Sequence, residues 1–361
     1  MRVTEHGHDG DAEVDPGPAG CTSSPALQER LAELVRSTSG AQGEGPGAGI
    51  LGGVGGAVQL DVYCRCADGA AHVCLGPALP VFVASVGKSL TAAGVLLLAE
   101  GGHVRLEDDV TGYYPALRPL LSGVRILHLL QHTSGLGDYA EVFDDGVVPD
   151  ETTNAQLVSL LAERGRLSHP AGAAHRYSNL GYVLLAGIIE QVSGQRYGEF
   201  MHARILGPLG MRDTFVVDDS DFETHHRAAS YARQVDGGAA KTCVWRVVGP
   251  GGFWSTARDL SAWDRGLWGG KLLCGHSLES MFTGGMTTNG QRVGYGLGWF
   301  VGGYNGRSCA WLTGRRDYFT SSLMHFMGED MTVIVLSNTA DIVAWRLAGR
   351  ISDLIGNSPP S

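Results

Sequence analysis

The stretch that decides the fold lies at residues 81–102 and reads VFVASVGKSLTAAGVLLLAEGG. It is rich in small and aliphatic residues from Ser85 to Glu100, and two glycines follow it. This pattern predicts a buried helix over 85–100. Ser85 and Lys88 stand three residues apart, and positions i and i+3 share one face of a helix. We therefore expect the amine of Lys88 to lie beside the hydroxyl of Ser85.

This pair suggests nucleophilic chemistry. A serine hydroxyl is a poor nucleophile at neutral pH and needs a base close to it. Lysine serves as that base when burial and a helix N-terminus lower its pKa, because both disfavour the ammonium form. The N–H groups of the same N-terminus could stabilise an oxyanion beside Ser85. The alternative is that Ser85 only caps the helix, a position that serine favours.

A second candidate is the tripeptide Tyr177–Ser178–Asn179, which precedes an apolar helix predicted over 180–193. The phenol of Tyr177 could relay a proton between Ser85, Lys88 and a leaving group. Asn179 could bind a substrate amide or hold Lys88. The structural alternative is a helix start, in which Ser178 or Asn179 caps the helix and Tyr177 packs against it.

Outward from these segments, the chain divides into three regions. Residues 1–24 are acidic, rich in Gly and Pro and poor in apolar side chains, which predicts a mobile tail. Strands are predicted near both ends of the remaining chain, and helices between them. The predicted helices are 25–36, 85–100, 126–130, 154–164, 180–193 and 342–355. The predicted strands are 58–66, 72–75, 295–302, 308–312, 319–326 and 332–337, with a turn at 67–69 joining the first two.

This order predicts an α+β fold, an α/β sandwich with one mostly antiparallel sheet flanked by helices. The two ends of the chain build the sheet, and a helical lobe is inserted between them. We expect one catalytic domain over 25–361. Its sheet lobe covers about 25–110 and 250–361, and its helical lobe covers about 111–249.

Composition and charge limit the classes of partner that the chain is expected to bind. The 361 residues carry 37 acidic and 27 basic side chains, a net charge of −10, and no cluster of Lys and Arg marks a nucleic-acid surface. No apolar run approaches the roughly 18 residues of a membrane helix, and no signal peptide follows Arg2. These features predict a cytosolic protein without a nucleic-acid or membrane partner. The seven cysteines are an odd count and are expected to be reduced.

Two motifs suggest other chemistry and fail on context. Residues 47–52 spell GxGxxG, but this motif binds a dinucleotide only where it follows a strand and opens a helix. Here it follows a loop and leads into a strand. Cys64, Cys66 and Cys74 with His72 could suggest zinc, but C-x-C is not the usual C-x2-C spacing. Cysteines at period 2 on one strand are more often small core residues. We expect no cofactor and no metal.

Taken together, the motifs resemble the serine beta-lactamase and penicillin-binding-protein superfamily, in particular its class C-like branch of esterases, D-aminopeptidases and acyltransferases. The resemblance covers the chain from about residue 27. It rests on VASVGKSLTAAGVLLLAEGGHVRLEDDV, ILHLLQHTSGL, RYSNLGYVLLAGIIEQVSG, ILGPLGMRDTF, GGFWSTARDLSAW, YGLGWFV and TVIVLSN, in the family's order. It implies a beta-lactamase/transpeptidase-like fold, with Ser85 as the acylated nucleophile, Lys88 as its base and Tyr177 as the second proton-transfer group. It also places Asn179 in the substrate cleft.

The family's third motif is a Lys or His, then Thr or another residue, then Gly, on a strand beside the nucleophile. The matching stretch AWLTGRRDYFTSS has Leu312–Thr313–Gly314, preceded by Trp311. Thr313 and Gly314 fit the motif, but Leu312 replaces the basic residue, and leucine cannot bind a substrate carboxylate. The resemblance implies the backbone N–H of Arg315 as the second oxyanion donor, at a position where glycine is expected. Efficient beta-lactam hydrolysis is therefore not expected.

The same stretch leaves two alternatives open. Arg315 and Arg316 could replace the missing basic residue, or they could be solvated loop side chains. Trp311, Leu312, Tyr318 and Phe319 suggest an apolar acyl pocket. His132, in HTSGL, is expected to be a packing residue in a turn rather than a catalytic base.

The sequence therefore predicts a serine hydrolase or acyltransferase that acts through a Ser85 acyl-enzyme on a small ester or amide, with a biosynthetic intermediate as one candidate substrate. Its partners would be a small acyl donor and either water or an amine or alcohol acceptor. The alternative is a non-catalytic binding protein that keeps the fold, because fold alone does not establish activity. The replaced residues Leu312 and Arg315 favour that alternative. The intact set of Ser85, Lys88 and Tyr177 favours the enzyme.

Overall fold

A computed structural model describes most of the chain. The described residues are 27, 29–30, 33–34, 37, 48–55, 57–64, 76–218, 227–228, 245–340 and 342–356. The predicted tail at 1–24 and the predicted strand at 72–75 lie outside them. So do Cys66, His72 and Cys74 of the zinc alternative.

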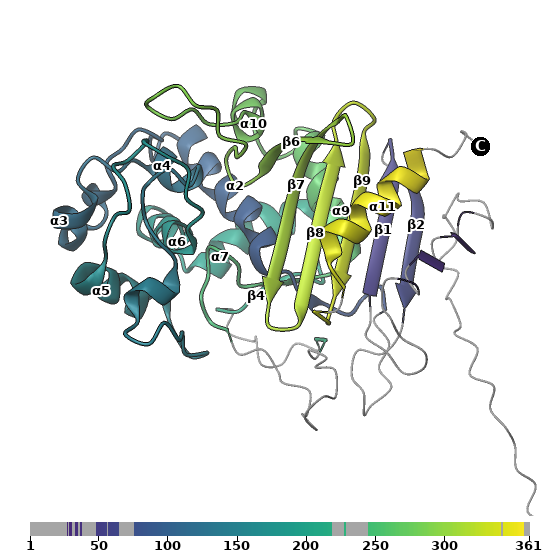
Figure 1. The fold of residues 1–361 in the computed structure, drawn as a ribbon, viewed down its shortest axis with the longest axis horizontal. Helices are drawn as coiled ribbons and strands as arrows, with labels where there is room; N and C mark the ends of the chain where they lie inside the picture. Colours follow the sequence, from purple (N-terminus) through teal and green to yellow (C-terminus); the bar gives the residue numbers. More distant parts are fainter. Residues whose placement is uncertain are drawn as a thin grey trace, which may run out of the picture.

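The centre of the molecule is a six-stranded antiparallel sheet in the order β2-β1-β9-β8-β7-β6. Its strands are β1 (Ala48–Val54), β2 (Ala57–Cys64), β6 (Phe300–Tyr304), β7 (Arg307–Arg316), β8 (Phe319–Phe326) and β9 (Met331–Ser337). The N-terminal hairpin β1–β2 pairs with β9 from the C-terminal end, so the two ends of the chain share one sheet, as predicted (Figure 1).

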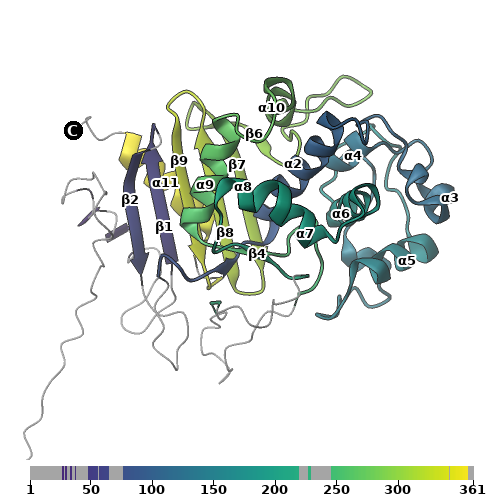
Figure 2. The same ribbon diagram turned by 180° about the vertical axis from the view of Figure 1, so that it is seen from behind.

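Helices cover both faces of this sheet. Helix α11 (Ala344–Gly356) packs on β8 and β9 on one face, and α9 (Ala257–Trp268) packs on β1 and β9 on the other (Figure 2). Every residue of β8 and β9 is buried. This explains why these strands, apart from His325, read as continuous apolar and small residues rather than as an alternating pattern. The predicted α/β sandwich is confirmed.

A helical lobe lies beside the sheet edge that carries β6 and β7 (Figure 1). Its core is α2 (Gly87–Glu100), which packs against α6 (Asn179–Ser193). Around them lie α3 (Arg118–Leu121), α4 (Ile126–Leu130), α5 (Asn154–Arg164), α7 (Tyr197–Met201), a π-helical turn (His202–Leu206), α8 (Gly207–Leu209) and α10 (Gly275–Phe282). A small sheet of β3 (Val81–Phe82), β5 (Phe253–Ser255) and β4 (Phe215–Val216) links the two parts.

The structure corrects the predicted elements at three points. Strand β1 forms within a stretch so rich in glycine that no strand was predicted there, and it is β1 that pairs with β2. Strand β7 continues four residues beyond the predicted end at 312. The edge strand β6 begins at Phe300, whereas 295–302 was predicted. Within the described ranges, none of the helices is both long and apolar enough to cross a membrane.

Candidate active site

Ser85 lies at the entry to α2, where the sheet meets the helical lobe. It occupies a 3-10 turn, Ala84–Val86, and α2 itself begins at Gly87. The helix N-cap is Val86, so Ser85 is not the capping residue that the structural alternative required. Ser85 is the only residue between Val81 and Leu96 that is not buried. A partly exposed hydroxyl in an otherwise buried segment is what a nucleophile needs, because substrate can reach it.

The backbone before Ser85 has an unusual conformation. Ala84 has a φ of 47°, in the left-handed region that alanine rarely adopts. Such a residue costs on the order of 1–3 kcal/mol and persists only where the surrounding structure imposes it. Strand β7 lies close to this turn, since a Cβ at Gly314 would collide with the carbonyl oxygen of Val83 and lie 3.0 Å from the backbone N of Ser85.

Lys88 is fully buried beneath Ser85. Its Nζ lies 3.0 Å from Ser85 Oγ, 2.7 Å from Asn179 Oδ1 and 2.9 Å from the carbonyl oxygen of Pro250. Burial lowers the pKa of Lys88 to about 7, and the charge of Asp138 opposes part of that shift. A substantial fraction of the amine is therefore neutral at neutral pH, which allows it to accept the Ser85 proton.

Tyr177 precedes α6 and approaches the same pair. Its hydroxyl shares a hydrogen bond with Ser85, and Lys88 Nζ lies 4.8 Å from the centre of its ring. Burial raises the pKa of Tyr177 above its ordinary value, so the phenol holds its proton at neutral pH. The cap of α6 is Ser178, whose Oγ accepts from the N–H of Gly181. Tyr177 therefore does not cap α6.

Asn179 is held by a residue that the sequence did not point to. Its Nδ2 donates to both carboxylate oxygens of Asp138, at 2.9 and 3.0 Å, while its Oδ1 faces Lys88. Asp138 also accepts from the N–H of Tyr139 and so caps the short helix Tyr139–Val142. Nothing in its local sequence distinguishes Asp138 from a surface capping residue, and only the long-range contact with Asn179 reveals its position.

His132 supports this arrangement from behind. It is fully buried, its Nδ1 accepts from the N–H of Ser178, and its ring lies 4.2 Å from that of Tyr177. Burial lowers the pKa of His132 well below its ordinary value, so the ring is neutral. It contacts neither Ser85 nor Lys88 through any hydrogen bond in the described part of the chain. The structure thus places His132 as a packing residue, in line with its expected role.

Strand β7 borders the site through Gly314. Its outer edge pairs with β6 only up to Trp311, and among the described strands none pairs with residues 312–316 on that side. An unpaired strand edge beside a nucleophile offers N–H and C=O groups to an extended substrate. The backbone N–H of Arg315 belongs to this open segment.

The side chains of β7 alternate between its two faces. Leu312 is buried in the core on the α2 side, where Phe319 also lies. Trp311 and Thr313 face the α11 side and line a separate cavity. Tyr318 is exposed in the turn after β7. The structure therefore does not bring Trp311, Leu312, Tyr318 and Phe319 together around one acyl pocket.

Arg315 and Arg316 differ in their exposure and contacts. Arg316 is half-buried, with Nη2 donating to Asp150 at 3.1 Å and its guanidinium lying 3.8 Å above the ring of Trp245. Arg315 is exposed. Arg316 is therefore already engaged, whereas Arg315 has the freedom to meet an anion. Within the described residues, no group of three or more His, Cys, Asp or Glu is placed to hold a metal ion.

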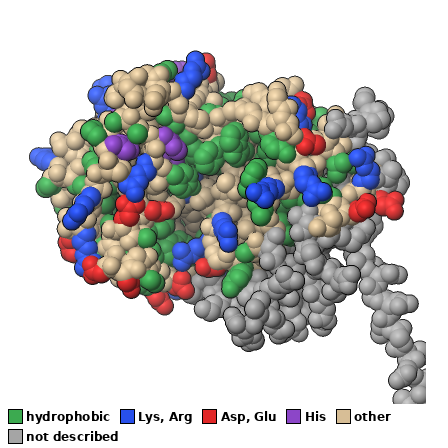
Figure 3. Space-filling model, viewed as in Figure 1, with side chains coloured by type: hydrophobic (Ala, Val, Ile, Leu, Met, Phe, Trp, Pro, Cys, Tyr) green, Lys and Arg blue, Asp and Glu red, His purple; other side chains and the backbone are tan. Residues whose placement is uncertain are grey.

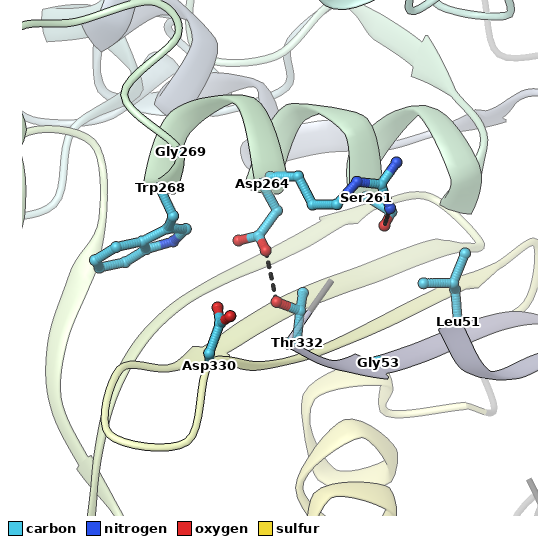
Figure 4. A pocket seen from close by; sticks show the side chains of 10 residues that line it. Leu51, Gly53, Ser261, Asp264, Trp268, Gly269, Asp330 and Thr332 are labelled. Carbon is cyan, nitrogen blue, oxygen red and sulfur yellow. Dashed lines mark hydrogen bonds between the residues drawn. The ribbon is translucent and has the colours of Figure 1, made fainter. Parts of the chain in front are cut away.

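A second cavity of about 300 Å³ lies away from these residues, between α9 and the strands β1 and β9 (Figure 4). Asp264 of α9 points toward β9 and accepts a 2.5 Å hydrogen bond from Thr332. None of the residues named for the Ser85 site lines this cavity. The Asp264–Thr332 contact ties α9 to the sheet, and we assign it a structural role.

This geometry agrees with a comparison of the sequence with known families, in which the model described as Beta-lactamase matches residues 27–350. The chain belongs to the Beta-lactamase family. Among curated proteins, penicillin-binding protein 4* of Bacillus subtilis (strain 168) is 32% identical over 279 residues, which cover 71% of this chain and 60% of that protein. The chain thus spans about three fifths of the length of such relatives.

Solved structures show the same fold. The octameric penicillin-binding protein homologue from Pyrococcus abyssi has a TM-score of 0.80 at 24% identity, with 92% of this chain and 78% of that chain covered. The D-amino acid amidase from Ochrobactrum anthropi SV3, complexed with L-phenylalanine amide, has a TM-score of 0.77 at 23% identity, with 92% and 98% covered. The predicted beta-lactamase/transpeptidase-like fold is confirmed.

Proposed function

We propose that the protein is a serine hydrolase or acyltransferase that forms an acyl-enzyme on Ser85. The observation that carries this proposal is the pairing of Ser85, partly exposed, with Lys88, fully buried, at 3.0 Å. A buried lysine with a pKa of about 7 and no carboxylate in direct contact is costly for folding. A role as a general base explains why the site keeps it.

The reaction begins when Lys88 accepts the proton of Ser85 Oγ and the oxygen attacks the substrate carbonyl. The N–H groups of Ser85 and Arg315 hold the resulting oxyanion. Tyr177 donates its proton to the leaving group, and Lys88 returns the proton to Tyr177. The bond between the acyl carbon and the leaving group breaks, and the Ser85 ester remains. Water, or an amine or alcohol acceptor, then attacks this ester by the reverse proton path.

Small esters and amides are the substrates that this site suits. Leu312 is buried in the core and presents no charge to a substrate carboxylate, which argues against efficient beta-lactam hydrolysis. Amide substrates gain support from the similarity to a D-amino acid amidase.

Intact-protein mass spectrometry tests the proposal. The protein is incubated with p-nitrophenyl acetate and, separately, with a beta-lactam, and Ser85→Ala is the control. We expect a mass increase of one acetyl group with the ester, absent from the control, and little labelling by the beta-lactam. Addition of an amine or alcohol then separates the two activities, because a transferase forms amide or ester product and a hydrolase forms only free acid.

A non-catalytic binding protein is the second candidate. Its supporting observation is that Leu312, packed in the core, replaces the basic residue of the third motif. If the wild-type protein remains unlabelled and releases nitrophenol no faster than Ser85→Ala, this candidate replaces the enzyme.

A further inference from the structure

An apolar cavity of about 350 Å³ lies on the α11 face of the sheet edge, close to the candidate active site. It is lined mainly by Phe300 and Tyr304 of β6, Trp311 and Thr313 of β7, Met324 of β8 and Trp345 of α11. Figure 3 shows hydrophobic side chains gathered on this face, over β6 and β7. Trp345 is 43% exposed, so part of its ring is open to a ligand in this cavity.

The cavity lies along β7, the strand that borders the turn carrying Ser85. Gly314 of β7 abuts Ser85, and Trp311 precedes it by three residues, roughly 10 Å along a strand. The pairing with β6 ends at Trp311, so the open edge of β7 runs from the cavity to Ser85. A substrate bound along this edge would have its reacting carbonyl at Ser85 and one of its ends at the cavity.

The ring contacts of Phe300 indicate which end of the substrate would lie at the cavity. Its ring stacks parallel to that of Tyr177, with 6.2 Å between centres and 2° between planes, and it also stacks on Trp311, with 5.6 Å between centres. In the proposed mechanism, Tyr177 protonates the leaving group, so the leaving group departs on the Tyr177 side. The row Tyr177–Phe300–Trp311 then leads from the leaving-group atom into the cavity.

We propose that this cavity binds an apolar or aromatic group on the leaving-group half of the substrate, and on the acceptor when the acyl group is transferred. This inference rests on the proposed function. During acylation the Ser85 Oγ–carbon bond forms, the carbon–oxygen or carbon–nitrogen bond to the leaving group breaks, and the leaving atom takes the Tyr177 proton. In the transfer step the acceptor occupies the position that the leaving group has vacated, so the same cavity selects both the leaving group and the acceptor.

The apolar lining excludes a charged leaving group as the preferred ligand. The polar side-chain groups of the lining are the hydroxyls of Thr313 and Tyr304 and the indole N–H groups of its two tryptophans, and none of them is charged. Arg346, next to Trp345, lies 5.6 Å from the Trp345 ring and outside this lining. A phenyl ring or a short branched alkyl chain fits such a space and covers the exposed rings.

Two pairs of esters test the proposal. Propyl acetate and 3-phenylpropyl acetate share the acyl group and release alcohols of similar acidity, and they differ in the phenyl ring of the leaving group. Ethyl butanoate and ethyl 4-phenylbutanoate carry the same difference on the acyl side. We expect wild-type kcat/KM to favour the phenyl member of the first pair by roughly tenfold or more. In Trp345→Ala and Trp345→Lys this preference should fall several-fold, with the second pair unaffected.

Val343→Ala is the matched control, because Val343 is apolar, 40% exposed and two residues from Trp345, but does not line the cavity. Both acetates give the same acetyl-enzyme. In the wild type and in each variant, the rate of its hydrolysis should therefore be the same whichever acetate formed it. A loss of preference only in the acyl pair, or no change in either pair, overturns the inference. Ser85 labelling by p-nitrophenyl acetate reports separately on the proposed function, and without that labelling both proposals fall.

Discussion

At the scale of single residues, the proposed mechanism depends on the ionisation of Lys88. Its three close contacts are a hydroxyl, an amide oxygen and a backbone carbonyl, so no carboxylate compensates its charge directly. Asp138 compensates part of it from beyond Asn179. The balance between burial and this distant carboxylate determines how much neutral amine is present at a given pH.

The first prediction concerns the pH dependence of acylation. Because only the neutral amine of Lys88 accepts a proton, the rate of Ser85 acylation by p-nitrophenyl acetate should rise with pH around a midpoint of about 7 and then level off. Stopped-flow measurement of the nitrophenol burst from pH 5.5 to 9 gives this profile. Lys88→Arg should lose the sigmoid and roughly 10²–10⁴-fold in rate, because a guanidinium stays protonated. A flat wild-type profile would exclude Lys88 as the base.

The second prediction concerns Asp138, which we regard as a positioning residue. Asp138→Asn removes the negative charge that raises the pKa of Lys88, so the midpoint of the acylation profile should move to lower pH. The rate at the plateau should also fall, by roughly tenfold, because Asn179 loses a charged acceptor and holds Lys88 less firmly.

Asp144→Asn is the control for this experiment, since Asp144 carries an 87% exposed side chain that pairs with Arg164. A purely structural role for Asp138 predicts a lower rate with an unchanged midpoint. That result would contradict the electrostatic link to Lys88.

At the scale of the elements, the position of β7 against the start of α2 makes the site. The two elements touch through Gly314 and the turn at Ser85, and Ser321 Oγ of the neighbouring strand β8 donates to the carbonyl oxygen of Val83 at 2.7 Å. Glycine is needed at 314 because backbone atoms of the Ser85 turn occupy the space of a Cβ. This contact also places the open edge of β7 beside Ser85.

Gly314→Ala should therefore push β7 away from Ser85. We expect acylation to fall by roughly 100-fold, since a displacement of about 1 Å at a reacting group has that effect, and the thermal midpoint to fall as well. Gly328→Ala, in the turn between β8 and β9 where a Cβ meets open space, is the matched control. Acylation at the wild-type rate in Gly314→Ala would show that the contact has no catalytic consequence.

Some of the helices, strands and contacts could be predicted from the sequence, and others could not. Helices α4 and α5 have the predicted bounds, because their apolar residues repeat with the helical period. Strand β1 was missed because glycine lowers strand propensity, whereas its pairing with β2 and β9 and the packing of α9 against it stabilise it. Ser85 and Lys88 follow from local spacing, whereas the contact of Asp138 with Asn179 joins segments 41 residues apart. The inward direction of Leu312 likewise depends on the register of β7 with β8, which single residues do not specify.

At the scale of the whole molecule, the candidate site lies where the sheet meets the helical lobe. The start of α2 carries Ser85 and Lys88, α6 and the residues before it carry Asn179 and Tyr177, and the sheet supplies Gly314. Packing these parts together encloses Lys88 completely. This enclosure removes the hydration of the Lys88 amine, which should lower the free energy of unfolding.

The last prediction follows from this cost. The folded chain holds Lys88 with a pKa of about 7, against an ordinary value of 10.5 in the unfolded chain. Between these values the unfolded state binds more protons, so the Lys88 contribution makes the free energy of unfolding rise with pH, by up to about 1.4 kcal/mol per unit. Below pH 7 both states are protonated and the full penalty remains. Burial raises the pKa of buried tyrosines such as Tyr139 and Tyr182, which reverses the trend above about pH 10.

Chemical denaturation at pH 7, 8 and 9 therefore gives the useful window. We expect the free energy of unfolding of the wild type to rise across it relative to Lys88→Met, in which the titrating group is absent. Lys271→Met, at an exposed lysine, should keep the wild-type slope. If wild type and Lys88→Met have equal slopes, Lys88 is not neutralised in the folded protein, and the proton acceptor for Ser85 must be sought elsewhere in the site. A slope difference together with an acylation midpoint near 7 would assign both effects to one buried amine.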